Sequence, residues 1–191
     1  RHAQPSRDAA TARWTRLRTG RTFAWPAASA LRWTAGALPS PHHDVKVFAY
    51  EYASGGGFAG RPLVAGLARE GDLMLRALLD DLSLLPGIQI LASRDGRLPP
   101  LSSIETITPA PGEDGFALFA RGVAACDAAW PTAPETDGIL ERLAHETLRQ
   151  GRTLLGCRPA AVQVATSKRA TAHALRAARV PVVPTFALSD G

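Results

Sequence analysis

The feature that most constrains the fold is a β-rich segment that ends in glycines and is followed by a long helical pattern. Residues 45–52 are mostly β-branched, aromatic and apolar, and residues 54–57 are Ser-Gly-Gly-Gly. A run of this kind is typical of a strand that enters a tight turn. In residues 62–85, apolar side chains recur at helical intervals, and these are Leu67, Met74, Leu78, Leu82 and Leu85. Their period predicts a helix, with Gly71 as a candidate kink inside it.

The same alternation of strand and helix continues to residue 157. The pattern predicts strands over 88–92, 128–132 and 153–157, a helix over 115–126, and a proline-rich loop over 93–112. A further helix is expected between a cap at Thr136 or Asp137 and a terminating glycine at Gly151. No two strands adjoin as a hairpin, so the sequence predicts an α/β fold with a parallel sheet. An α+β arrangement of the same elements is the alternative.

The first 43 residues differ from the rest in charge and in pattern. They hold seven arginines and one acid, which gives +6, whereas residues 44–191 carry a net charge of −1. Apolar residues in this segment follow no sustained period, so we expect it to be irregular. Three interpretations stay open: a targeting segment, a basic arm that contacts phosphates, or upstream sequence that packs on nothing.

The composition of the chain excludes some classes of protein. No run of about 18 apolar residues occurs, so a membrane-spanning helix is not expected. Cys126 and Cys157 have no metal-ligand spacing, so we expect two small buried thiols in a reducing, cytoplasmic location. The chain does not begin with Met, and we expect it to be a piece of a longer protein.

The glycine turn is the first candidate site. Residues 55–60 match the pattern GxGxxG, and Gly55, Gly56 and Gly57 follow a predicted strand, where open α/β sheets bind ligands. A dinucleotide site also needs an acid about 20 residues further on. The acid at the end of the second strand, Asp95, follows Gly60 by 35 residues, and Pro62 lacks a backbone donor. A dinucleotide site is therefore disfavoured, while a substrate-binding turn and a plain turn both stay open.

Two charged residues are further candidates. Lys168 is one of only two lysines, and the expected cap at Thr166 or Ser167 places it in the first turn of a helix. A cation there opposes the helix dipole but is suited to meeting a phosphate, and a solvated surface lysine is the alternative. Glu135 follows the strand predicted over 128–132 and is a candidate for binding a substrate amine.

Several segments occur in an order and spacing found in one family. They are residues 48–57 (FAYEYASGGG), 70–82 (EGDLMLRALLDDL), 133–140 (APETDGIL), and the segments 154–157, 165–175 and 180–185. The first two resemble the opening strand, turn and first helix of ATP-grasp proteins related to tyramine–glutamate ligase. The third is similar to the turn after their last strand before the ATP-grasp domain. The remaining segments resemble the beginning of that domain.

The resemblance implies a Rossmann-like pre-ATP-grasp domain over residues 44–157 and the beginning of an ATP-grasp domain over 158–191. It also implies a ligase in which ATP phosphorylates a small-molecule carboxylate, an amine attacks the acyl phosphate, and Mg²⁺ bridges the phosphates. In such enzymes the first lysine of the ATP-grasp domain reaches the nucleotide phosphates, and Lys168 matches that place. No nucleic-acid or membrane partner is expected.

The chain departs from the family pattern in places. Many relatives have Asp where this chain has Ser167, and Gly where it has Arg179. The second phosphate-binding lysine, the adenine-binding strand and the magnesium-binding acids are expected beyond Gly191. The chain as given is therefore not expected to complete the reaction alone. The alternative is a self-contained Rossmann-type nucleotide-binding module without ligase activity.

Overall fold

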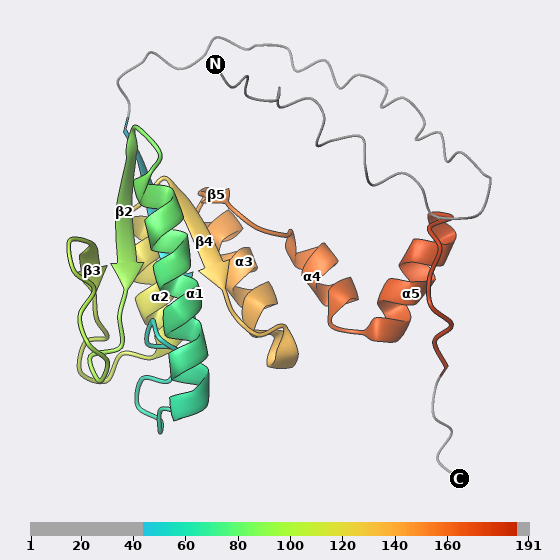
Figure 1. Cartoon of the computed structure of the whole chain (residues 1–191), viewed down its shortest axis with the longest axis horizontal. Coiled ribbons are helices and arrows are strands. Elements are labelled where there is room, and N and C mark those ends of the chain that lie inside the picture. The colour runs from blue at the N-terminus through green and yellow to red at the C-terminus, as the bar shows by residue number, and fades with distance from the viewer. Residues whose placement is uncertain (1–43, 187–191) are drawn as a thin grey trace, which may run out of the picture. The chain divides into compact units, whose positions relative to one another are not determined.

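The structure is a computed structural model that describes residues 44–186 (Figure 1). Its centre is a five-stranded sheet in the order β3-β2-β1-β4-β5, and every neighbouring pair is parallel. The strands are β1 (Val45–Glu51), β2 (Ile88–Ser93), β3 (Glu105–Ile107), β4 (Ala128–Thr132) and β5 (Thr153–Leu154). The predicted parallel α/β sheet is therefore confirmed, and the α+β alternative is wrong.

Helices connect the strands and cover both faces of the sheet. They are α1 (Ala65–Ser83), α2 (Gly115–Ala124) and α3 (Ile139–Arg149), with a short 3-10 turn, η2 (Thr136–Gly138), before α3. Two further helices, α4 (Pro159–Ala165) and α5 (Lys168–Ala177), follow the last strand. Helix α1 packs on one face, whereas α2 and α3 pack on the other (Figure 1). This arrangement is the one that right-handed crossovers between parallel strands produce.

Two apolar clusters fill the space between the sheet and its helices. The cluster under α1 is built from Val47, Ala49, Leu75, Leu79, Leu82, Ala92, Leu101 and Ala128. The cluster under α2 and α3 is built from Phe48, Tyr50, Tyr52, Leu91, Phe119, Val123, Cys126, Ala129 and Leu143. Successive residues of β1 point into opposite clusters, as the period of two requires. β1 is therefore buried on both faces, as expected for a central parallel strand.

The prediction of a loop throughout residues 93–112 is wrong at β3. Residues 105–107 pair with β2 in parallel register, with Glu105 opposite Leu91. This edge strand has only three residues, and two of them, Glu105 and Thr106, are exposed. Because the strand is short and exposed, its sequence has no alternation of apolar and polar residues. The prolines around it are typical of a loop. A salt bridge of 2.8 Å from Lys46 to Glu105 ties it to β1.

Helix α1 turns a different face to the sheet from the one predicted. Its buried residues are Ala68, Gly71, Leu75, Leu79 and Leu82, of which only the last belongs to the predicted stripe. Leu67 and Met74 are 45% and 54% exposed. Leucines lie on both flanks of this helix, so their spacing does not fix the buried face. The small residues Ala68 and Gly71 fix it, because they let the helix approach the sheet closely.

Gly71 does not break α1, which runs through it without interruption. A Cβ atom at this position would lie 2.8 Å from Oε1 of Glu51 and closer still to Cδ and Oε2. Glycine is therefore needed for a close approach, and the predicted kink is wrong. Helix α1 rests directly on the carboxylate that ends β1.

The expected cap of α3 is also wrong. Gly138 precedes the helix in a left-handed conformation, and no side chain caps it. Asp137 lies in η2 with a φ of 57°, so neither it nor Thr136 serves as the cap. The end of the helix follows the prediction, because Gly151 comes just after it with a φ of 69°, as a terminating glycine should.

Beyond β5, α4 contacts α3 and α5. Pro159 begins α4, and the Ser167 hydroxyl accepts a hydrogen bond from the Ala170 N–H at the start of α5, both as predicted. Within residues 44–186, no helix is long and apolar enough to cross a membrane. The expectations for residues 1–43 lie outside the described part of the chain.

Candidate functional site

The turn after β1 and the loop after β4 lie at the same edge of the sheet. The two strands pair directly, with Glu51 opposite Thr132 at their carboxyl ends. The turn carries the predicted glycines, and the loop carries Glu135. This edge is where open α/β sheets bind their ligands.

Glu51 organises the turn after β1. Its carboxylate is almost fully buried and accepts hydrogen bonds from the Ala53 N–H at 3.1 Å, the Ser54 N–H at 2.7 Å and the Ser54 hydroxyl at 2.8 Å. A buried carboxylate is tolerated where such donors surround it. Sequence analysis did not select Glu51, because the contacts that explain it form only on folding.

The three predicted glycines are buried, and close packing accounts for each of them. A Cβ atom on Gly55 would meet the Glu51 carbonyl and the Ser93 hydroxyl. One on Gly56, whose φ is +103°, would lie 2.8 Å from Leu118, and one on Gly57 would meet the Tyr52 ring. A substrate-binding role for these glycines stays a prediction.

The turn also uses its own backbone donors. The Gly55 N–H donates to the Glu51 carbonyl at 2.7 Å, and the Gly57 N–H donates to the Tyr52 carbonyl at 2.8 Å. The backbone N–H groups of two of the three glycines are therefore already used and cannot bind a pyrophosphate. This geometry favours the structural interpretation of the GxGxxG pattern over a dinucleotide site.

Asp95, the acid that a dinucleotide fold would use for the ribose, is buried and already paired. Its carboxylate accepts hydrogen bonds from Arg97, which keep the pKa of Asp95 below its ordinary value. Arg97 also donates to the Phe58 carbonyl at 3.0 Å and to the Arg61 carbonyl at 2.7 Å. The pair therefore fastens the glycine turn to the loop that follows β2.

A hollow of about 450 Å³ opens at this edge, between α1 and the loop after β4. We call this hollow the amine hollow. Its walls are mainly apolar and include Leu67, Met74, Pro131, Pro134 and Leu140, together with the rings of Tyr52 and Phe58. Of the residues between 44 and 186 that line it, only Glu70 and Glu135 are charged. Neither carboxylate has a hydrogen bond or ion pair with any residue of the described range.

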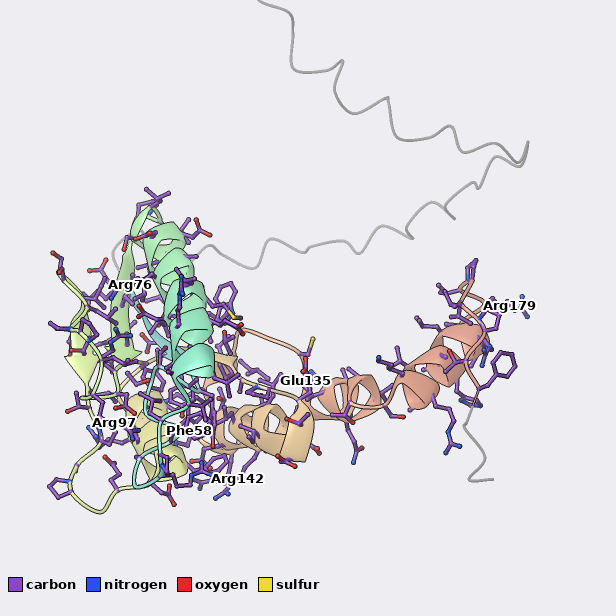
Figure 2. All side chains as sticks on the ribbon, turned by 60° about the horizontal axis from the view of Figure 1, so that its bottom comes forward. Phe58, Arg76, Arg97, Glu135, Arg142 and Arg179 are labelled. Atoms are coloured by element: carbon purple, nitrogen blue, oxygen red, sulfur yellow. The ribbon has the colours of Figure 1, made fainter. Side chains whose placement is uncertain are left out.

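The glycines do not line the amine hollow, but the residues at the two ends of their turn do. The rings of Tyr52 and Phe58 pack edge to face, with centroids 5.3 Å apart. Arg61 donates to the Tyr52 hydroxyl at 2.7 Å and to the Gly57 carbonyl at 2.8 Å. Figure 2 labels Phe58 and Glu135, which line this hollow from the two segments. The glycine turn thus shapes one wall through its flanking aromatic residues.

A partly buried ion pair fixes α1 beside the hollow. The Arg94 side chain is 3% exposed and pairs with Asp72, the residue after Gly71. Burial raises the pKa of Asp72, but hydrogen bonds from Arg76 and Arg94 outweigh it, so the pKa lies below its ordinary value. Arg94 also donates to the Pro99 carbonyl at 2.8 Å. The pair holds the part of α1 that contributes Glu70 and Met74 to the hollow.

Lys168 is the first residue of α5 and is exposed, as predicted. Its ammonium group has no ion-pair partner within residues 44–186. The Ser167 cap holds the helix start without using this side chain. The position is therefore available to an anion, while its role in nucleotide binding stays a prediction.

The described residues contain no group of three or more His, Cys, Asp and Glu side chains that could hold a metal ion. The magnesium expected from the resemblance therefore has no binding cluster in this part of the chain. The two cysteines differ, because Cys126 is buried whereas Cys157 is exposed. The expectation of two buried thiols is wrong for Cys157.

Residues 88–162, from β2 into α4, match the family model described as the pre ATP-grasp 3 domain. The match includes Glu135 but neither the glycine turn nor Lys168. A crystal structure assigned to the ATP-grasp superfamily, from Archaeoglobus fulgidus, is similar in fold, with a TM-score of 0.56 and 20% sequence identity. The similarity covers 70% of this chain and 40% of that one, so the chain spans less than half of its length. No curated protein gives a significant match.

These findings agree with the element order and sheet of the described residues. Residues 88–162 are similar in sequence to a pre-ATP-grasp domain, and the fold is similar to that of the Archaeoglobus fulgidus structure. The chain therefore has an α/β fold with a five-stranded parallel sheet, and it carries a pre-ATP-grasp domain match over residues 88–162.

Proposed function

We propose that the chain is the N-terminal part of an ATP-dependent ligase that joins a small-molecule carboxylate to an amine. The pre-ATP-grasp match and the similarity in fold to part of an ATP-grasp superfamily structure support the general class. The observation that carries the specific reaction is the amine hollow. Among the described residues, it combines an apolar and aromatic wall with two unpaired carboxylates, Glu70 and Glu135, and has no lining cation.

This chemistry suits a cationic amine that carries an apolar body. The ammonium group would lie between or beside Glu70 and Glu135, because opposite charges and charge-assisted hydrogen bonds favour that position. The apolar part would contact Met74 and the rings of Tyr52 and Phe58. A carboxylate substrate would be repelled by the same two acids, so it needs a different place. Apolar walls with a few polar groups that fix orientation are typical of small-molecule sites.

Lys168 would bind the nucleotide phosphates. The structure presents its ammonium group at an exposed helix start, where the free N–H groups also attract an anion. Bound ATP would supply the phosphoryl group that activates the substrate carboxylate. The described residues form no cluster for Mg²⁺, so no step is assigned to the ion here.

Residues 158–191 would begin the ATP-grasp domain. The described part of this segment buries few residues, namely Pro159 and Val162 in α4 and Ala172 in α5. Several large apolar side chains are exposed there, namely Val164, Leu175, Val180, Val183 and Phe186. Exposed apolar groups of this density are expected where a segment packs against further chain.

The experiment is a product assay on the full-length protein, with ATP, candidate carboxylates and a set of arylalkyl and alkyl amines. The proposal predicts ADP release that requires both co-substrates, with one amide formed for each ADP. ADP release at the same rate without an amine would reject the carboxylate–amine reaction while leaving the fold assignment intact.

A further inference from the structure

A second hollow, of about 550 Å³, lies between α2 and α3 and shares no lining residue with the amine hollow. Its volume falls within the range of about 300–1,000 Å³ found for small-molecule sites. The side chains that matter for its chemistry are those of Asp114, Phe116, Arg142, His145, Glu146 and Arg149. We call it the α2–α3 hollow.

Arg142 is held in a defined position in this hollow. The central carbon of its guanidinium group lies 3.6 Å from the centroid of the Phe116 ring. Stacking of this kind orients the guanidinium plane and leaves its N–H groups available at the edge. Within residues 44–186, Arg142 forms no hydrogen bond or ion pair with any side chain or backbone group. Figure 2 labels this residue, which projects from α3.

The acids of the α2–α3 hollow already have partners. An Asp114 oxygen accepts from the Phe116 and Ala117 N–H groups at 2.9 and 2.8 Å. Glu146 accepts two bonds from Arg149, at 2.6 and 2.7 Å, and one from Gln150 at 2.7 Å. Arg149 is thereby neutralised as well. The two acids and two arginines that line the hollow balance in charge. Among the described residues, Arg142 is the lining arginine whose N–H groups have no hydrogen-bond partner.

We propose that the α2–α3 hollow binds a phosphate group through bidentate hydrogen bonds from Arg142. The planar fork of a guanidinium matches two oxygens of a phosphate. The phosphate would come from inorganic phosphate or from the monoester of a small molecule, for which the hollow has space. His145, one helical turn along α3, supplies a further polar wall. This site is independent of the amine hollow and of the ligase activity.

One aromatic contact lies between the α2–α3 hollow and the amine hollow. The Phe116 ring under Arg142 lies 6.5 Å from the Tyr52 ring, centroid to centroid. Tyr52 lines the amine hollow.

The test measures binding of inorganic phosphate and of phenyl phosphate to the chain of residues 1–191 by calorimetry, at constant ionic strength. Arg142→Gln should weaken phosphate binding about tenfold or more, because it removes charge-assisted hydrogen bonds. Arg142→Lys keeps the charge but loses the planar guanidinium and its stacking on Phe116. Its phosphate affinity should lie between that of Arg142→Gln and that of the unchanged protein. Arg69→Gln is the control, since Arg69 is exposed on α1 and has no partner in the described range. Melting temperatures of all variants should agree, which shows that each one folds.

Tighter binding of phenyl phosphate than of inorganic phosphate would identify a monoester as the ligand, and equal binding would identify the free anion. Either result supports the site. The proposal is overturned if phosphate binding does not saturate, or if Arg69→Gln weakens it as much as Arg142→Gln does. Acetate that competes as tightly as phosphate would also overturn it, because a carboxylate site would then be the correct description.

Discussion

Gly71 offers the sharpest test of how α1 is fixed to the sheet. In an ordinary helix, replacing glycine by alanine stabilises the protein by about 1 kcal/mol. At Gly71 the added Cβ would overlap the carboxylate of Glu51, with 2.8 Å to Oε1 and shorter distances to Oε2 and Cδ. Overpacking costs about 1–3 kcal/mol. Displacing the carboxylate would also weaken its hydrogen bonds to Ala53 and Ser54, each worth about 1.5–3 kcal/mol.

We therefore expect Gly71→Ala to destabilise the protein by about 2 kcal/mol. For a chain of this size the melting temperature should fall by roughly 4–8 °C. Gly66→Ala is the matched control, because Gly66 lies in the same helix and a Cβ there meets nothing within 4 Å. It should leave stability unchanged or raise it by up to about 1 kcal/mol.

Thermal unfolding followed by circular dichroism gives both values. Glu51→Ala will itself destabilise the protein. In that background, Gly71→Ala should no longer lower the melting temperature, because the carboxylate that clashes with the added Cβ is absent. A Gly71→Ala variant that is stabilised as much as Gly66→Ala would refute the reasoning.

Three further predictions concern single side chains. A hydrogen bond from Arg149 lowers the pKa of Glu146 from 4.5 to about 2. The unchanged protein should therefore be more stable than Glu146→Gln above pH 4.5, and this difference should fade as the pH falls toward 2. A difference in unfolding free energy that stays constant over this pH range would contradict the prediction. Burial raises the pKa of Cys126 to about 11, so a disulfide reagent at pH 8 should label Cys157 quickly and Cys126 only after unfolding. Rapid labelling of both thiols in the folded protein would contradict this prediction. In the full-length protein, Lys168→Ala should weaken ATP binding while leaving stability unchanged or raising it by up to about 1 kcal/mol, and calorimetry that finds unchanged ATP affinity would make the lysine structural.

The parallel sheet could be predicted from the sequence because its main strands and helices are long enough to show their periods. The predicted bounds of β1, β2 and β4 agree with the structure to within a residue or two. The start of α5 was also predictable, because Ser167 is a strong cap and acts locally. β3 could not be found, since a three-residue edge strand with exposed side chains has no apolar pattern.

The candidate site was only partly predictable. Glu135 was selected because it follows a strand, and the structure places it in the amine hollow. Glu70 was missed because it lies on the α1 flank that the leucine spacing assigned wrongly to the sheet side. Glu51 and Gly71 contact each other across 20 residues of sequence. No local pattern marks such a contact, so the reason for Gly71 became visible only in the fold.

The central claim, that the amine hollow receives the amine substrate, is tested most directly by steady-state kinetics of the full-length protein. Glu135→Gln and Glu70→Gln should each raise the KM for the amine about tenfold and leave the KM for ATP unchanged, because each removes one charge-assisted contact. Asp81→Asn is the control, since Asp81 is exposed on α1 and does not line the hollow. Unchanged amine KM in both Glu variants, or equal effects in the Asp81 control, would contradict the account.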